Sequence, residues 1–99
     1  VQSSRLTGAV LKVQEAAENF KAVDGDADRL AKELDGILEG QNVIVYYDTD
    51  WKPAAGQTDD NYRMDIQLDR DQNLITAVIV MSHAQDEIYR LKIQKVTDA

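Results

Sequence analysis

The chain of 99 residues contains no cysteine, and it has only one histidine and one proline. Without cysteine it forms no disulfide, no thiolate zinc site and no iron–sulfur cluster, and it has no cysteine nucleophile. The sequence also lacks an apolar run of the roughly 20 residues that a membrane-spanning helix needs. Its longest apolar run, residues 74–81, falls far short of that length.

Basic residues are the minority, with 11 Lys and Arg against 18 Asp and Glu, for a formal net charge of −7. Residues 24–71 hold 13 acidic and 5 basic side chains, whereas the rest of the chain is nearly balanced. This charge disfavours nucleic acid and anionic membrane surfaces as partners. A hydrophobic content of 43% and a charged content of 29% predict one globular domain spanning residues 1–99, not a disordered tail.

Two segments near the start of the chain have apolar residues at helical spacing. Residues 5–22 and 27–39 are therefore predicted to be amphipathic helices, the second capped by Asp26 at its start and followed by Gly40. The apolar stripe of the first helix comprises Leu6, Ala9, Val10, Val13, Ala16, Ala17, Phe20 and Val23.

From residue 42 onward the apolar period changes to two, which is typical of strands. The pattern predicts strands at 43–47, 62–69, 74–81 and 88–96, with short turns between the last three. Short turns favour antiparallel neighbours, with 74–81 in the middle of that meander. We therefore expect an α+β fold: an N-terminal helix plus a second, shorter helix packed on one face of a four-stranded, mostly antiparallel meander sheet.

Acidic side chains are frequent in the long loop predicted at residues 48–61. Asp48, Asp50, Asp59 and Asp60 offer the oxygen ligands that calcium prefers. Aspartate is equally at home in a solvated loop, so a calcium site and a purely structural role both remain open. No other cofactor is expected.

Aromatic residues in and before this loop are candidates for binding a partner. Trp51 lies among the acidic residues, and Tyr46 and Tyr47 precede them. Because Trp and Tyr are enriched at interfaces, one hypothesis is a small αβ adaptor domain that uses the Trp51 loop and the acidic face. The alternative for Trp51 is a side chain folded back over the edge of the sheet.

The candidates for catalysis are few. His83 is the only conventional general base and is predicted to lie in a solvated turn next to Ser82. Neighbours within one turn do not form a catalytic triad, which needs groups from separate elements. With no glycine-rich phosphate loop and no metal-type histidine cluster, the sequence predicts a protein that is not an enzyme. Arg90, Lys92 and Lys95 form a basic strip on the last predicted strand, which either protects a sheet edge or meets an acidic surface.

The order of these segments resembles the soluble part of a type IV pilin-like protein, namely a minor pseudopilin of type II secretion or a minor type IV pilin. The resemblance rests on the amphipathic helix at 5–20, the loop region that follows it, and the meander strands at 62–66, 74–80 and 88–93. The cleavage site and hydrophobic helix half of that family do not occur in this sequence, nor does its common cysteine pair.

The resemblance implies a non-enzymatic assembly subunit that takes part in protein transport. It further implies a place in the periplasm or cell envelope, anchored in the inner membrane by an N-terminal segment that lies outside this sequence. The partners would be other protein subunits, and calcium binding in the β region would be a family property. On this hypothesis Leu6, Val10 and Val13 contact neighbouring subunits and are partly exposed in the isolated domain.

Overall fold

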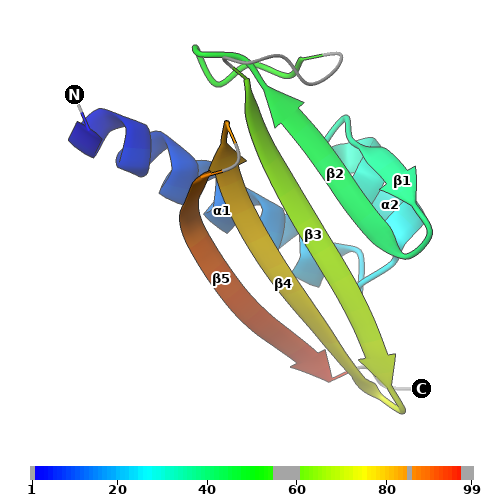
Figure 1. Ribbon diagram of the computed structural model, residues 1–99. Helices are drawn as coiled ribbons and strands as arrows, with labels where there is room; N and C mark the ends of the chain where they lie inside the picture. Colours follow the sequence, from blue (N-terminus) through cyan, green and yellow to red (C-terminus); the bar gives the residue numbers. More distant parts are fainter. Residues whose placement is uncertain (1, 55–60, 85, 97–99) are drawn as a thin grey trace.

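The fold consists of two helices followed by an antiparallel sheet. The computed structural model describes residues 2–54, 61–84 and 86–96, with side chains from Leu6 onward. Figure 1 shows the elements in chain order: α1 (Gln2–Ala22), α2 (Ala27–Glu33), β1 (Ile37–Glu39), β2 (Asn42–Tyr47), β3 (Tyr62–Asp71), β4 (Leu74–His83) and β5 (Asp86–Val96). The strand order β1-β2-β3-β4-β5 is a simple meander in which each strand pairs antiparallel with the next.

The sheet has five strands, so the expectation of four is wrong. Residues 37–39 continue the helical spacing of the second helix, but they form β1 and pair with β2. The helix ends at Glu33 because Asp35 turns to a φ of 55° and Gly36 then passes close to β2. A Cβ at Gly36 would lie 2.9 Å from the Val45 side chain, so this approach needs glycine.

Gly40 also has a different role from the helix end predicted for it. Together with Gln41 it makes the two-residue turn between β1 and β2, and its φ is 63°. Glycine at the first position of such a turn supplies the positive φ that the hairpin requires. The predicted turn at 70–73 is confirmed in place but is shorter, because β3 continues to Asp71 and only Gln72 and Asn73 lie outside the strands.

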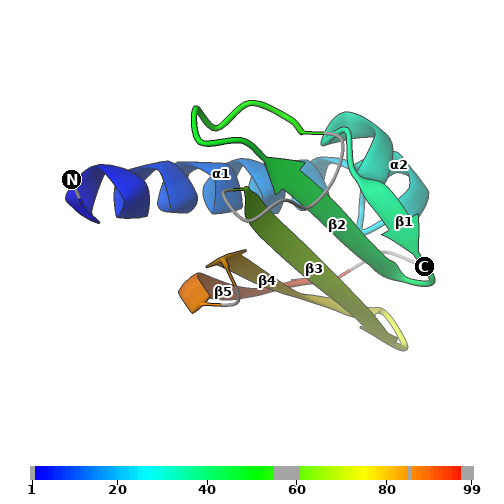
Figure 2. The same ribbon diagram turned by 45° about the horizontal axis from the view of Figure 1, so that its top comes forward.

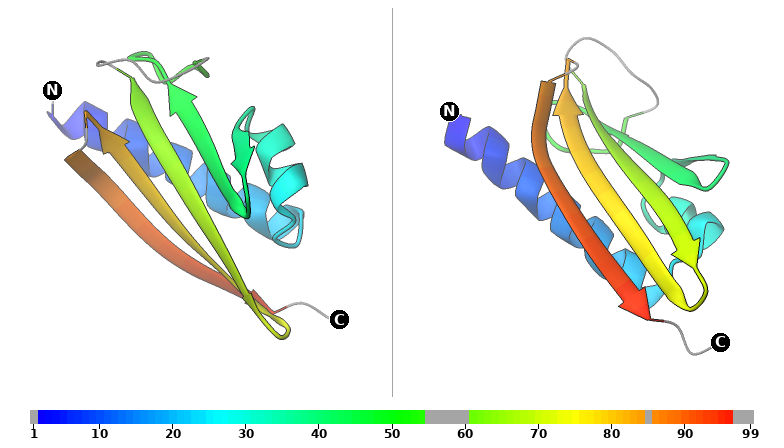
Figure 3. Two further views of the ribbon diagram at one scale, coloured as in Figure 1. Left: turned by 45° about the vertical axis from the view of Figure 1, so that its right-hand side comes forward. Right: turned by 60° about the horizontal axis from the view of Figure 1, so that its bottom comes forward.

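Both helices cover the same face of the sheet, as expected (Figure 2). α1 lies across β4 and β5, and α2 lies over β1 and β2. The start of α1 projects past β5 on the side away from β4 (Figures 1 and 3). No helix of the described residues covers the opposite face of the sheet, so outward and buried residues alternate along β4 and the first half of β3.

The core lies between α1 and the covered face of the sheet. Val13 and Phe20 of α1 are fully buried there, together with alternate residues of the strands: Val43, Val45, Met64, Ile66, Ala77, Ile79 and Met81. β5 contributes Tyr89, Leu91 and Ile93, which are half-buried because β5 is the edge strand. Their placement on the opposite face from Arg90 and Lys92 confirms the predicted alternation.

The end of α1 is fastened to β5 by a lysine. Nζ of Lys95 donates to the backbone carbonyl of Lys21 and to the Asp24 carboxylate, which lies 2.5 Å away. The hydrogen bond and charge of Lys95 hold the pKa of Asp24 below its usual value. The prediction that Arg90, Lys92 and Lys95 form one basic strip is therefore wrong for Lys95. Lys95 faces the helix, whereas Arg90 and Lys92 face the open side of the sheet.

Candidate functional site: the projecting end of α1 and its surroundings

The apolar stripe of α1 is covered by the sheet along most of its length and loses that cover near the start of the helix. Ala9 and Val13 are fully buried, so the expectation that Val13 is partly exposed is wrong. Val10 is half-buried, and Leu6, one turn earlier on the same stripe, is 46% exposed. The change follows from geometry, because the first turns extend beyond β5 and none of the described strands lies beneath them (Figure 1).

The outer face of α1 carries a second exposed apolar residue, Leu11, which is 60% exposed. Leu11 lies beside Gln14, Glu15 and Glu18, so its surroundings are polar. Leu11 was not identified as a candidate from the sequence, because it falls outside the apolar stripe of three- and four-residue spacing. The sequence could have indicated this exposed residue, because a large apolar side chain away from the buried stripe does not contribute to the core.

Trp51 folds back onto the protein, which is the second of the two alternatives considered for it. Its ring stacks on Tyr62 with 3.9 Å between centroids and lies 6.0 Å from the ring of Tyr47. The indole also lies against Gly8 of α1, where a Cβ would come within 2.2 Å of Nε1. The indole therefore needs the space left by the missing side chain of Gly8. This accounts for a glycine inside a helix, where glycine is otherwise destabilising.

The turn that presents Trp51 is built by Asp48. The Asp48 carboxylate accepts hydrogen bonds from the backbone N–H of Asp50 at 2.8 Å and of Lys52 at 3.0 Å. Trp51 itself has a φ of 64°, which a bulky side chain rarely adopts. The packing on Tyr62 and Gly8 and the two Asp48 hydrogen bonds hold this conformation in place.

Tyr47 and Tyr46 lie on opposite faces of the sheet. Tyr47 is buried beneath α1, and burial, followed by the charges of Glu15 and Asp35, raises the pKa of its hydroxyl to about 12. The ammonium of Lys12 lies 5.3 Å from the Tyr47 ring centroid, in cation–π range. Tyr46 is half-buried on the open face, with the Arg63 guanidinium 6.0 Å from its ring.

The predicted calcium residues are only partly placed. Asp48 and Asp50 lie in the turn before Trp51, whereas Asp59 and Asp60 lie outside the described residues. Within the described ranges no cluster of three or more His, Asp or Glu side chains is arranged to hold a metal ion. One Asp48 carboxylate oxygen is already engaged by two backbone N–H groups, which gives this residue a structural role.

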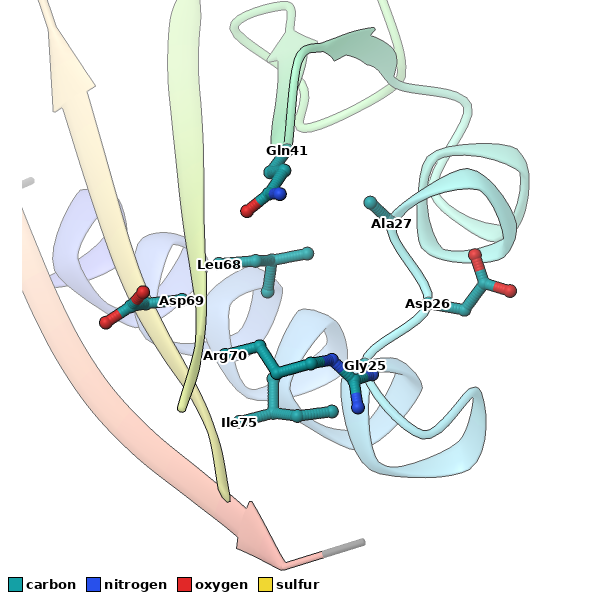
Figure 4. Close-up of a pocket in the computed structure, with 8 residues that line it drawn as sticks. All are labelled: Gly25, Asp26, Ala27, Gln41, Leu68, Asp69, Arg70 and Ile75. Atoms are coloured by element: carbon teal, nitrogen blue, oxygen red, sulfur yellow. The ribbon is translucent and has the colours of Figure 1, made fainter. Parts of the chain in front are cut away.

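His83 ends β4 instead of lying in the solvated turn predicted for it. Its ring is half-buried against Tyr62, with 4.8 Å between centroids. A recess of about 330 Å³ lies at the other end of the sheet and is lined by Gly25, Asp26, Ala27, Gln41, Leu68, Asp69, Arg70 and Ile75. Figure 4 shows Arg70 and Gln41 directed into it and Asp69 and Asp26 turned away. Asp26 caps α2 there by accepting from the backbone N–H groups of Asp28 and Arg29, as predicted.

No family model matches this chain, and neither the curated proteins nor the solved structures include a match. In the parts of the chain that the structure describes, no helix combines the length and the apolar character needed to cross a membrane. The candidate site is therefore defined by geometry alone: the uncovered start of the α1 stripe, with Leu6 at its centre and the edge of β5 beside it.

Proposed function

We propose that this chain is a non-enzymatic subunit of a protein assembly. The observation that carries the proposal is the exposure of Leu6 on a stripe whose other members are buried or, at Val10, half-buried. We take this exposed continuation of the core stripe, next to the half-buried Val10, as the surface that another polypeptide covers. The 60% exposure of Leu11 on the outer side of the same helix supports contact on two sides of α1.

The assembly we propose resembles that of minor pseudopilins or minor type IV pilins. An N-terminal helix of 21 residues, followed by a sheet that covers one side of the helix except at its start, is the arrangement such a subunit needs. In this form of the proposal the protein is anchored in the inner membrane and works in the periplasm or cell envelope. It requires an apolar helical segment directly ahead of Val1, and the sequence of the encoding gene tests this requirement.

The adaptor alternative has less support. It needs Trp51 and Tyr47 to be available to a partner, but Trp51 is stacked on Tyr62 and Tyr47 is buried. Of its three aromatic residues, Tyr46 on the open face retains the most freedom, and it already lies beside Arg63.

Cysteine cross-linking tests the proposed function directly, because the chain has no cysteine of its own. The variant Leu6→Cys, produced in the source cells, is treated with a short bismaleimide, and Glu33→Cys on α2 serves as the exposed control. We expect Leu6→Cys to give covalent adducts of discrete mass and Glu33→Cys to give none. Equal adduct patterns for both variants, or none from Leu6→Cys, would contradict an assembly surface on α1.

A further inference from the structure

β5 is a long strand with one unpaired edge. It spans 11 residues and, among the residues that the structure describes, pairs with β4 on one side only, because it is the last strand of the sheet. Natural proteins usually shorten or cover such an edge, since its free N–H and C=O groups are a template for another strand. The other edge strand, β1, has three residues and therefore offers far fewer backbone groups for pairing.

The free edge and the uncovered helix turns lie on the same side of the molecule. In Figure 1 and in the right view of Figure 3 the start of α1 projects past β5 on the side away from β4, and Figure 2 shows that it also extends beyond the start of β5. A strand added next to β5 and continued past the start of β5 would therefore lie beneath these turns. Its side chains on the helix face would cover Leu6 and Val10, as β4 and β5 cover Val13 and Phe20 further along.

The charges of β5 decide which kind of strand fits. β5 carries two acidic side chains at its start, Asp86 and Glu87, and three basic ones further along, Arg90, Lys92 and Lys95. Lys95 is engaged by Asp24 and the Lys21 carbonyl, and Arg90 pairs with Glu87 at 2.8 Å. Lys92 lies on the open face opposite Val78 and has no ion pair among the described residues.

A second copy of β5 is a poorer occupant, because antiparallel pairing centred on any of residues 90–93 places no acidic residue opposite Arg90 or Lys92. If two copies pair antiparallel around Leu91, Arg90 of each lies opposite Lys92 of the other. Pairing centred on Arg90 or on Lys92 places that residue opposite itself. Like charges directly opposite each other destabilise a strand pair. Pairing centred on Ile93 avoids the like charges but sets only Val96 and Gln94 opposite Arg90 and Lys92. An acidic residue in the same positions would be attracted by both basic side chains.

We propose that the edge of β5 binds an extended, acidic segment of a partner protein as a sixth strand under the start of α1. The segment alternates apolar residues, which contact Leu6 and Val10, with acidic residues, which face Arg90 and Lys92. This inference rests on the proposed function and names the chemistry of the partner. Backbone hydrogen bonds to β5 supply affinity, and the alternating side chains supply specificity.

The test uses a blocked synthetic peptide of about eight residues, an ordinary strand length, that alternates valine with glutamate. Binding to the whole chain is followed by titration calorimetry, and amide hydrogen exchange is followed by NMR. We expect the peptide to protect those β5 amides that point away from β4. The matched peptide with lysine in place of glutamate is expected to bind at least about tenfold more weakly.

Two pairs of variants locate the contact. Lys92→Glu is expected to weaken binding about tenfold, whereas Lys32→Glu on α2, with the same charge change, leaves it nearly unchanged. Leu6→Gln is expected to weaken binding, and Leu11→Gln, on the outer side of the helix, is not. Circular dichroism verifies that each variant is folded.

Three results would overturn the inference. They are the absence of binding, binding without protection of β5, and protection of β5 that rises with protein concentration and needs no peptide. The last would make a second copy the occupant. None of these results removes the cross-links expected from Leu6→Cys, so the proposed function is judged separately.

Discussion

The contact between Gly8 and Trp51 predicts that replacing Gly8 by alanine destabilises the protein, although the same replacement stabilises an ordinary helix. In an ordinary helix interior, replacing glycine by alanine stabilises by about 1 kcal/mol. Here the new methyl group would lie 2.2 Å from Nε1 and 2.4 Å from Cε2 of the indole, both far inside contact distance. The indole cannot move aside freely because it is stacked on Tyr62. Overpacking of this kind typically costs about 1–3 kcal/mol.

We therefore expect Gly8→Ala to lower the free energy of unfolding by about 1 kcal/mol, the difference between these two effects. Trp51→Ala alone is expected to cost about 2–4 kcal/mol, because a half-buried and stacked indole is lost. In the Trp51→Ala background the clash is absent. Gly8→Ala should then stabilise by about 1 kcal/mol, which gives a coupling energy of about 2 kcal/mol.

Urea unfolding followed by circular dichroism measures all four proteins of this cycle. Gln14→Gly, at an exposed position of the same helix, is the control and should cost about 1 kcal/mol in both backgrounds. If Gly8→Ala stabilises the protein whether or not Trp51 is present, the packing of the indole on α1 is refuted, and Trp51 becomes available to a partner again.

Three further predictions concern titration and the Trp51 turn. Because the pKa of Tyr47 is about 12 in the folded protein and 10.0 in the reference state, stability should fall as pH rises from about 10 to about 12, and Tyr47→Phe should remove this part of the loss. The lowered pKa of Asp24 means that its ion pair with Lys95 stabilises the folded protein at pH values above about 3.8, and that this stabilisation is lost as the pH falls below that value. Lys95→Met should therefore lower the Tm at neutral pH and remove this acid dependence. Asp48→Ala should cost about 1 kcal/mol in urea unfolding because two backbone N–H groups lose their acceptor, whereas Asp48→Asn keeps a carbonyl oxygen and most of the stability. Equal losses for Ala and Asn would mean that the side chain does not build the turn.

The change of apolar period near residue 42 was sufficient to predict most of the fold. Strands β3 and β5 and the helix-facing residues of β5 follow from alternation, because one face of the sheet is buried and the other is more exposed. Strands β2 and β4 follow from short β-rich apolar runs, and the antiparallel order of β3 to β5 follows from the short turns between them. The first strand was missed for a physical reason. Ile37 and Leu38 continue the helical spacing of α2, and only tertiary contact at Gly36 shows that the chain must leave the helix before them.

The candidate site was predictable in part. Leu6 and Val10 were identified from the helical stripe, but their exposure depends on where the sheet ends, which no local pattern records. Val13, three residues further along, is buried by that same sheet. The role of Trp51 depends on a pairing between Gly8 and a loop more than 40 residues away, so both of its alternatives were consistent with the sequence.

The central claim is that this chain meets its partners through the start of α1 and the neighbouring edge of β5. The most direct measurement is amide hydrogen exchange of the chain within its native assembly, compared with the chain alone. The account predicts added protection in residues 6–11 and in the outward amides of β5. Protection confined to residues 48–54 and to the acidic residues of α2 would contradict it.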